Sequence, residues 1–176
     1  MQYSKLNVLH WHIVDSPSFP YASARFPSLA RGGAFDQHHV YSASDVASVV
    51  EYARARGIRV IPEFDVPGHT FPSWDREAVL AGNSTLLTRC DAYASTGGYG
   101  PLRADREETY SFLGELFAEV GTAFPDAVLN IGGDEVHSGC YESNPEVAAY
   151  LRQHNMTGTE LVGAFAKRVL KLVHTT

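Results

Sequence analysis

The chain has 176 residues, of which 44% are hydrophobic and 19% are charged, and its formal net charge is -6. This length suits one domain with a sizeable core, and the acidic balance is unlike the basic surface of a nucleic-acid-binding protein. No apolar run approaches the roughly 20 residues of a membrane-spanning helix. We therefore expect one folded domain with neither a nucleic-acid partner nor a membrane span.

Two cysteines, Cys90 and Cys140, are too few for a disulfide framework but permit a single bridge. Asn83 and Asn155 each begin an acceptor tripeptide for N-glycosylation. These features together favour a protein of the secretory pathway. The apolar run 8–14 contains two His and a Trp and lacks a small-residue cleavage site, so we expect any signal peptide to lie upstream.

The first half of the chain predicts one strand and one helix. Residues 5–13 are rich in Leu, Val, Trp and Ile, which is typical of a buried strand. A polar stretch with prolines and aromatic residues covers 15–41. The helix that follows has an N-cap at Ser42 or Ser44 and is ended by Gly57.

The second half continues this alternation. Residues 58–64 form the next apolar strand, and a loop rich in Gly, Pro, Ser and Thr extends over 65–104. Asp105 can begin a second helix, in which apolar residues recur at helical spacing. The remaining elements are a short apolar strand at 127–131, a helix with Pro145 in its first turn, and a helix over 159–173. Alternating apolar strands and helices predict an α/β fold with a parallel sheet covered by helices.

Carboxylates and imidazoles gather at the C-terminal ends of the three predicted strands. Active sites of parallel α/β proteins form at this edge of the sheet. Packing alone does not explain why three separate strands should end in such residues. The residues concerned are His12, Asp15, Glu63, Asp65, His69, Asp134 and Glu135.

Asp134 and Glu135 follow a glycine pair directly after the third strand. Neighbouring residues of an extended segment point to opposite sides, so we expect these carboxyl groups to have different partners and different pKa values. That arrangement suits one neutral acid and one persistent anion. The alternative is a tight glycine turn in which both residues cap the next helix.

Glu63 and Asp65 lie two residues apart, hence on one face of a strand, and His69 follows on a tight turn. In the functional interpretation a carboxylate holds His69, which shares a proton network with a catalytic acid. In the structural interpretation the same residues form a salt bridge at the rim of the sheet.

His10 and His12 have a spacing found among zinc ligands, and His69 and Asp134 could complete a metal site. A barrel metal hydrolase is therefore one alternative. It leaves Glu135 without a role and lacks an intact ligand set, so we expect no metal.

Three segments resemble the signature blocks of family 20 β-N-acetylhexosaminidases, and they occur in that family's order and spacing. They are KLNVLHWHIVD at 5–15, PEFDVPGHT at 62–70 and GGDEV at 132–136. The segments 51–54 and 56–60 are similar to the eukaryotic lysosomal and secreted branch. The resemblance covers nearly the whole chain.

The resemblance implies a (β/α)8 barrel that removes terminal N-acetylglucosamine or N-acetylgalactosamine from β-linked glycans, without a cofactor. The reaction retains configuration and is substrate-assisted, with the 2-acetamido oxygen as nucleophile. By the family match, Glu135 protonates the leaving oxygen. Asp134 orients the acetamido group and stabilises its developing positive charge.

Four further residues match supporting positions of the family. Asp15 and His69 match a hydrogen-bonded relay to the acid. Asp65 and Glu63 match positions that support substrate binding. The resemblance thus assigns a role to each carboxylate and imidazole of these blocks except the two histidines of the first strand.

Cys90 and Cys140 match a disulfide that ties two active-site loops in the lysosomal enzymes. Tyr141 stands where these relatives have a Trp, so we expect it to line the sugar pocket by stacking. Phe71 and Trp74 could serve the same purpose, but we expect both in the core.

A barrel of this type needs about 250 residues, so residues 1–176 are expected to be the central part of the catalytic domain. Three βα units form an incomplete barrel, and the family's sugar-binding Arg and later aromatic pocket residues lie outside it. We expect the isolated chain to be inactive and the full-length protein to be lysosomal or secreted and to form a homodimer. The alternative is a truncated, non-catalytic protein that binds amino sugars or a protein partner.

Overall fold

The computed structural model describes residues 1–74, 86–90 and 98–174. Its strands are β1 (Val8–Val14), β2 (Arg59–Phe64), β3 (Leu87–Arg89) and β4 (Tyr99–Leu102). A short 3-10 helix, η1 (Gln2–Ser4), precedes β1. The α-helices are α1 (Pro27–Gly33), α2 (Ala43–Arg54), α3 (Glu107–Ala123), α4 (Ser138–Ser143), α5 (Pro145–His154) and α6 (Gly158–His174).

The strands β1 and β2 pair in parallel, as the sequence predicts, with His12 opposite Glu63. The predicted third strand at 127–131 runs beside β2 but forms only an isolated parallel bridge between Glu63 and Asn130. Two backbone hydrogen bonds accompany this bridge, from Phe64 N to the Asn130 carbonyl and from Val66 N to the Ile131 carbonyl. The pairing ends there because the next two residues are glycines with positive φ, outside the extended region.

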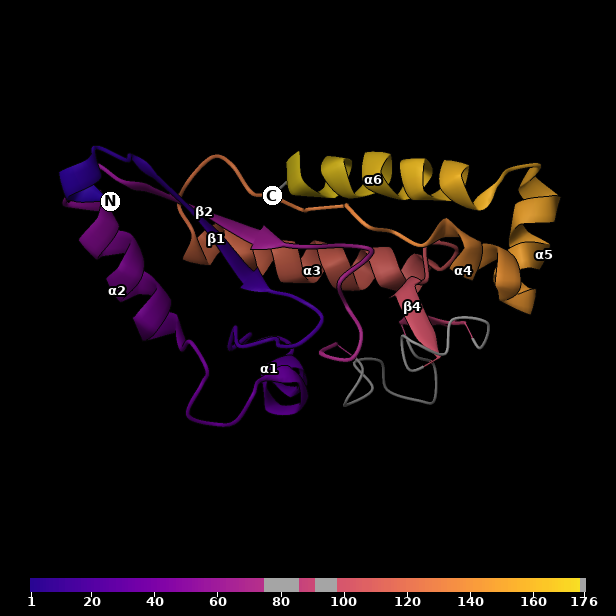
Figure 1. Cartoon of the computed structure of the whole chain (residues 1–176), viewed down its shortest axis with the longest axis horizontal. Helices are drawn as coiled ribbons and strands as arrows, with labels where there is room; N and C mark the ends of the chain where they lie inside the picture. Colours follow the sequence, from indigo (N-terminus) through magenta and orange to yellow (C-terminus); the bar gives the residue numbers. More distant parts are fainter. Residues whose placement is uncertain (75–85, 91–97, 175–176) are drawn as a thin grey trace.

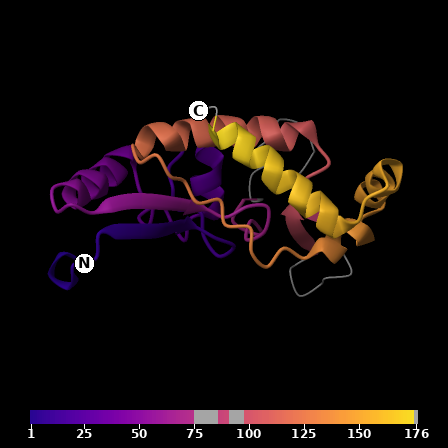
Figure 2. The ribbon, with the colours of Figure 1, turned by 90° about the horizontal axis from the view of Figure 1, so that it is seen from above.

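The two faces of the strand pair differ in character. Leu9, Trp11 and Ile13 of β1 point toward the core, where the Trp11 ring packs edge-on against Tyr41 and Phe124. The helices α2 and α3 lie on one side of the strands, and α6 packs along α3 (Figures 1 and 2). Val8, His10 and His12 of β1 are exposed on the other face, whereas Val14 at the end of the strand is buried. The polar side chains of the strands are therefore kept apart from the helical layer.

Several helix boundaries agree with the sequence prediction. Ser42 caps α2 in a capping box with Asp45, and Gly57 takes a φ of 66° after the helix. Pro145 occupies the first turn of α5, where Asn144 accepts hydrogen bonds from two backbone N–H groups. The helix α3 begins at Glu107 rather than at Asp105.

The reason for the later start of α3 is an ion pair. The carboxylate of Asp105 accepts two hydrogen bonds from the Arg103 guanidinium, at 2.7 and 2.6 Å. Both side chains are more than nine-tenths buried. A buried, paired carboxylate is not available to cap the helix, so Asp105 belongs to the preceding turn.

Five short elements, including η1, were not predicted. The segment 15–41 contains α1, the segment 65–104 contains the antiparallel pair β3–β4, and α4 precedes α5. Such elements are too short for periodicity to reveal, and they depend on tertiary contacts. None of the helices in the described part of the chain has the length and apolar character that a membrane crossing requires.

A disulfide joins Cys90, directly after β3, to Cys140 in α4, with their Cα atoms 5.3 Å apart. The backbone of Gly100 in β4 lies against it. A Cβ atom at this position would come within 2.4 Å of Cys140 Sγ and 2.7 Å of Cys90 Sγ, so no larger residue fits. The disulfide therefore anchors the β3–β4 hairpin to the segment that follows residues 134–135.

Candidate active site

His69 lies at the centre of four carboxylates. Its Nδ1 is 3.0 Å from Oδ1 of Asp15. Its Nε2 is 3.6 Å from Oε2 of Glu135, 3.8 Å from Oδ2 of Asp65 and 3.9 Å from Oδ2 of Asp134. The ends of β1 and β2 and the segment after residue 131 therefore converge on one imidazole, as expected for the C-terminal edge of a parallel sheet.

Close backbone contact holds this cluster together. Gly132 has a φ of 60°, and a Cβ atom there would lie 2.1 Å from Asp65 Oδ1. The next residue, Gly133, donates its backbone N–H to the same oxygen at 2.8 Å. His69 itself has a φ of 52°, a left-handed turn that directs its ring back toward the strand ends. The glycine pair is therefore required for the carboxylate of Asp65 to approach this loop.

The expectation that Asp134 and Glu135 point to opposite sides is wrong. Both carboxylates lie within 4 Å of the same His69 nitrogen. The segment is not extended, because Glu135 has a φ of 51° and follows two glycines with positive φ. Both side chains are largely exposed, at 70% and 75%. The pair is thus presented together at the surface, with one shared basic neighbour.

The electrostatics of the cluster favour bound protons. Burial raises the pKa of Asp65 from 3.8 to about 6; the Gly133 N–H opposes this shift and the neighbouring Asp134 carboxylate adds to it. Burial alone lowers the pKa of His69, but the carboxylates of Asp65, Asp15 and Asp134 outweigh that effect, and its pKa is raised above 6.5. The neighbouring carboxylates therefore favour the protonated form of the His69 imidazole.

Two buried polar atoms of the cluster could each take part in one further hydrogen bond. Among the described residues, Asp65 Oδ2 and His69 Nε2 are buried atoms that make no hydrogen bond. His69 Nε2 faces the exposed carboxylates of Asp134 and Glu135, and Asp65 Oδ2 lies 3.8 Å from the same nitrogen. Buried polar atoms are normally satisfied, so this position is suited to a polar ligand.

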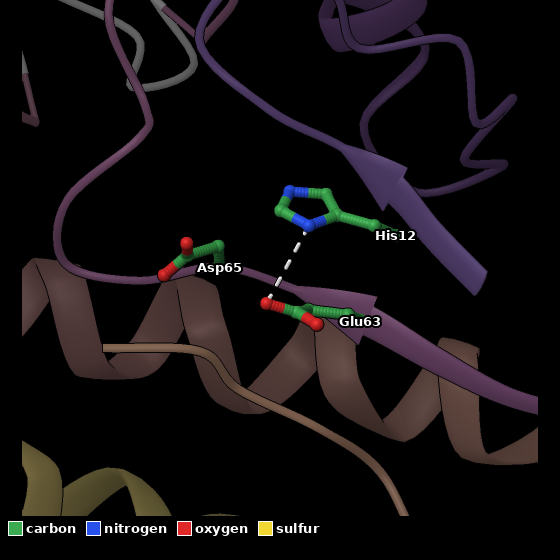
Figure 3. A group of neighbouring side chains, drawn as sticks. All are labelled: His12, Glu63 and Asp65. Atoms are coloured by element: carbon green, nitrogen blue, oxygen red, sulfur yellow. Dashed lines mark ion pairs between the residues drawn. The ribbon is translucent and has the colours of Figure 1, made fainter. Parts of the chain in front are cut away.

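The cluster continues across the face of the strand pair. His12 Nε2 is 3.4 Å from Asp15 Oδ2, and His12 Nδ1 is 3.6 Å from Glu63 Oε1. Figure 3 shows His12 on β1 directed toward Glu63 on β2, with Asp65 just beyond the strand. The other oxygen of Glu63 pairs with His10 and accepts a hydrogen bond from Asn130 Nδ2.

Carboxylates and imidazoles therefore alternate without a gap from Glu135, through His69, to His10. Asn130 was not predicted as part of this network. In the sequence it is one amide residue at the end of an otherwise apolar strand. Such a residue is equally common in a purely structural role, so the pattern did not indicate a site residue. The structure identifies the partners of Asn130. Its Nδ2 lies 3.1 Å from Glu63 Oε2 and 3.2 Å from His10 Nε2.

The three histidines proposed for the alternative metal site do not converge. Within the described residues, the groups with metal-ligand spacing are His12–Glu63–Asp65 and Asp65–His69–Asp134. Each contains one imidazole, and neither contains His10. The ligand set of His10, His12 and His69 is therefore not assembled.

The aromatic residues occupy different environments. Tyr141 is completely buried, and its hydroxyl donates to the Leu102 carbonyl at 2.7 Å. The expected sugar-stacking role does not fit this position, because a buried ring has no free face. Trp74 is in the core, as expected, whereas Phe71 is half-buried and stacks on Tyr99.

The two predicted glycosylation sites also differ. Asn155 is exposed and ends α5 in a left-handed conformation with a φ of 51°. Asn83 lies outside the described residues. An exposed Asn155 remains accessible to modification, which stays a prediction.

Comparison with known proteins places this chain in a family. All 176 residues match the catalytic domain of glycosyl hydrolase family 20. The chain is 45% identical to the human protein "Beta-hexosaminidase subunit beta", with 99% of this chain and 31% of that protein covered. It therefore spans about three tenths of the length of this relative.

Two solved structures share the fold. A chitobiase from Flavobacterium johnsoniae is 28% identical with a TM-score of 0.78, over 99% of this chain and 26% of that one. A Streptomyces plicatus beta-hexosaminidase mutant, solved in complex with the product GlcNAc, is 26% identical with a TM-score of 0.67, over 96% and 31%. The chain belongs to glycosyl hydrolase family 20 and is a part of its catalytic domain.

Proposed function

We propose that the protein containing this chain removes terminal N-acetylglucosamine or N-acetylgalactosamine from β-linked glycans, with Glu135 as the general acid. The observation that carries this proposal is the cluster in which one imidazole, His69, lies within 4 Å of the adjacent Asp134 and Glu135. Membership of family 20 supports the reaction class, and the human relative's name supports the substrate class.

In the proposed reaction the substrate supplies the nucleophile. The acetamido oxygen attacks the anomeric carbon as the glycosidic C–O bond breaks, and Glu135 gives its proton to the departing oxygen. The resulting oxazolinium ring carries a positive charge near the acetamido nitrogen, which Asp134 stabilises. Water then attacks the anomeric carbon, the bond from that carbon to the acetamido oxygen breaks, and the Glu135 carboxylate takes a proton from the water. Two displacements at one carbon retain its configuration.

Adjacency of the two carboxylates suits this chemistry. Asp134 and Glu135 serve neighbouring parts of one sugar, the acetamido group and the glycosidic oxygen. His69 lies beside both, and Asp15 holds its other nitrogen at 3.0 Å. We therefore assign His69 and Asp15 to the positioning of the acid and the control of its protonation, with Asp65 as the buried carboxylate behind them.

The proposal applies to the longer protein, since this chain covers 31% of the human relative. Activity is best tested in a chimera in which residues 1–176 replace the matching segment of the human beta-hexosaminidase subunit beta. The chimera supplies the rest of the catalytic domain while keeping residues 1–176 unchanged.

The first prediction concerns Glu135. Glu135→Gln in the chimera should lower kcat for a chromogenic aryl N-acetyl-β-glucosaminide by about 10²–10⁴-fold, the usual contribution of a general acid or base. Binding of N-acetylglucosamine, followed by calorimetry, should change little because the amide keeps the size of the side chain. Glu108→Gln, at an exposed position on α3, is the matched control and should keep the parent rate.

Each alternative predicts a different outcome. A non-catalytic amino-sugar-binding protein would bind N-acetylglucosamine in a chimera that never cleaves substrate. A metal hydrolase would lose its activity on dialysis against a chelator. Near-normal turnover by Glu135→Gln would remove Glu135 from the role of acid.

A lysosomal or secreted location forms part of the proposal. Disulfides persist mainly in oxidising compartments, and Cys90 is bonded to Cys140. The exposed sequon at Asn155 agrees with this location.

A further inference from the structure

His12, on β1, is an imidazole that the reaction proposed above does not use. It pairs with Glu63 in the register of β1 and β2, and its ring is directed toward that residue (Figure 3). Its Nδ1 is 3.6 Å from Glu63 Oε1, and its Nε2 is 3.4 Å from Asp15 Oδ2. Each ring nitrogen of His12 therefore faces a carboxylate, and one of these carboxylates, Asp15, belongs to the proposed relay.

The two oxygens of Asp15 face different imidazoles. Oδ1 is 3.0 Å from His69 Nδ1 and also accepts the backbone N–H of Ser16. Oδ2 faces His12. The Asp15 side chain is 38% exposed, so packing alone does not fix the orientation of its carboxylate. A partner for Oδ2 limits the rotation of this carboxylate and thereby keeps Oδ1 directed at His69.

Glu63 supports the other side of the His12 ring. The Glu63 side chain is only 8% exposed. Its Oε2 pairs with His10 and accepts a hydrogen bond from Asn130 Nδ2 at 3.1 Å. These two partners hold the carboxylate in place and leave Oε1 facing His12. His12 thus lies between a buried, well-held carboxylate and the partly exposed carboxylate of Asp15.

We propose that His12 is a positioning residue for the general acid: supported by Glu63, it fixes Asp15. Asp15 in turn holds His69, whose Nε2 is 3.6 Å from Glu135 Oε2. Proton transfer requires the acid within hydrogen-bond reach of the departing oxygen, so small displacements along this chain of contacts lower the rate. His12 therefore acts on the reaction through Glu135 without touching the substrate.

This inference rests on the proposed function, so its test asks whether His12 acts through the acid. The chimera is assayed with methyl N-acetyl-β-glucosaminide, whose leaving oxygen needs a proton. The second substrate is 2,4-dinitrophenyl N-acetyl-β-glucosaminide, whose leaving group departs as a stable anion. His12→Asn should lower kcat/KM for the methyl glycoside by about tenfold, part of the roughly 10²–10⁴-fold that general acid catalysis contributes. The value for the dinitrophenyl glycoside should change little, because its cleavage does not depend on the acid.

Two further variants separate the contacts of His12. The amide of Asn lies near the position of Nδ1, on the Glu63 side, whereas the longer Gln can place its amide nitrogen near Nε2, on the Asp15 side. His12→Gln should therefore recover most of the rate that His12→Asn loses on the methyl glycoside. His10→Asn is the matched control, because His10 pairs with the other oxygen of Glu63. It should keep the parent ratio of the two kcat/KM values. Circular dichroism and melting temperature show whether each variant is folded.

The possible outcomes separate the two proposals. Equal losses on both substrates in His12→Asn mean that His12 is structural, which overturns the inference and leaves the role of Glu135 intact. An unchanged rate on the methyl glycoside, or the same selective loss in His10→Asn, also overturns it. Failure of His12→Gln to recover the rate shows that His12 does not act through Asp15, which overturns it as well. A chimera whose cleavage of the methyl glycoside survives Glu135→Gln refutes the proposed function, and this inference with it.

Discussion

Asp65 is the buried carboxylate of the cluster, with 1% of its side chain exposed. Its pKa of about 6 in the folded chain lies above the usual 3.8. The contribution of the Asp65 carboxyl group to the free energy of unfolding is therefore complete below about pH 4. It is lost as the pH rises through about 6. The raised pKa of His69 has the same sign, since its contribution is present below pH 6.5 and is lost as the pH rises through its folded-state value.

Asp65→Asn should remove this pH dependence while its amide oxygen keeps the bond from Gly133. Between pH 4 and pH 7.5 the parent chain should lose roughly 2–3 kcal/mol of stability relative to the variant, because each pKa unit is worth about 1.4 kcal/mol. Urea unfolding at several pH values measures the difference. Asp126→Asn is a control, because the hydrogen bond from Arg59 lowers the pKa of Asp126. The contribution of Asp126 to stability should therefore depend on pH in the opposite direction. A difference between parent and Asp65→Asn that is flat with pH would contradict the assignment.

At the residue scale, the sequence identified which side chains gather but not how they are oriented. Strand ends in a parallel sheet converge, so His69, Asp15 and Asp134 could be placed together from strand order alone. The direction of Glu135 could not be predicted, because it depends on a positive φ after two glycines. The burial of Tyr141 was missed for a similar reason: its environment is built by β4, which lies 39 residues earlier at Leu102.

The principal link between elements is the Cys90–Cys140 disulfide, which spans 50 residues. The double variant Cys90→Ser, Cys140→Ser should lower the free energy of unfolding by roughly 4 kcal/mol in the chain-entropy model. That is a large share of the about 5–15 kcal/mol typical of a domain. The chain has two cysteines, so reductant should destabilise the parent equally and leave the variant unaffected, as urea unfolding can show. A parent that reductant does not destabilise would contradict this prediction.

Element boundaries were predictable wherever a local signal decides them. The capping box of Ser42 and the first-turn position of Pro145 involve only neighbouring residues. The hairpin β3–β4 has no such signal. It is held by Cys140 and by the hydrogen bond from Leu102 N to the Pro67 carbonyl, both distant in sequence.

At the scale of the whole molecule, we predict that activity requires more of the catalytic domain than this chain contains. The 176-residue chain should not cleave the aryl N-acetyl-β-glucosaminide at a rate above that of its Glu135→Gln variant, whereas the chimera should. The reason is that the described chain contains the proposed acid and its proposed relay, while a complete barrel needs about 250 residues. Comparable kcat/KM values for the chain and the chimera would show that the cluster suffices by itself.

The sequence alone determined the α/β class, a parallel sheet with strands at 5–13 and 58–64, and the family, because these depend on apolar runs and on three linked motifs. Only the tertiary structure decided that Asp134 and Glu135 face one imidazole, that Tyr141 is core, and that Phe71 meets Tyr99. Those features arise from positive φ angles and from contacts between segments far apart in the chain. Local patterns specify elements, whereas the geometry of a site depends on how the elements pack.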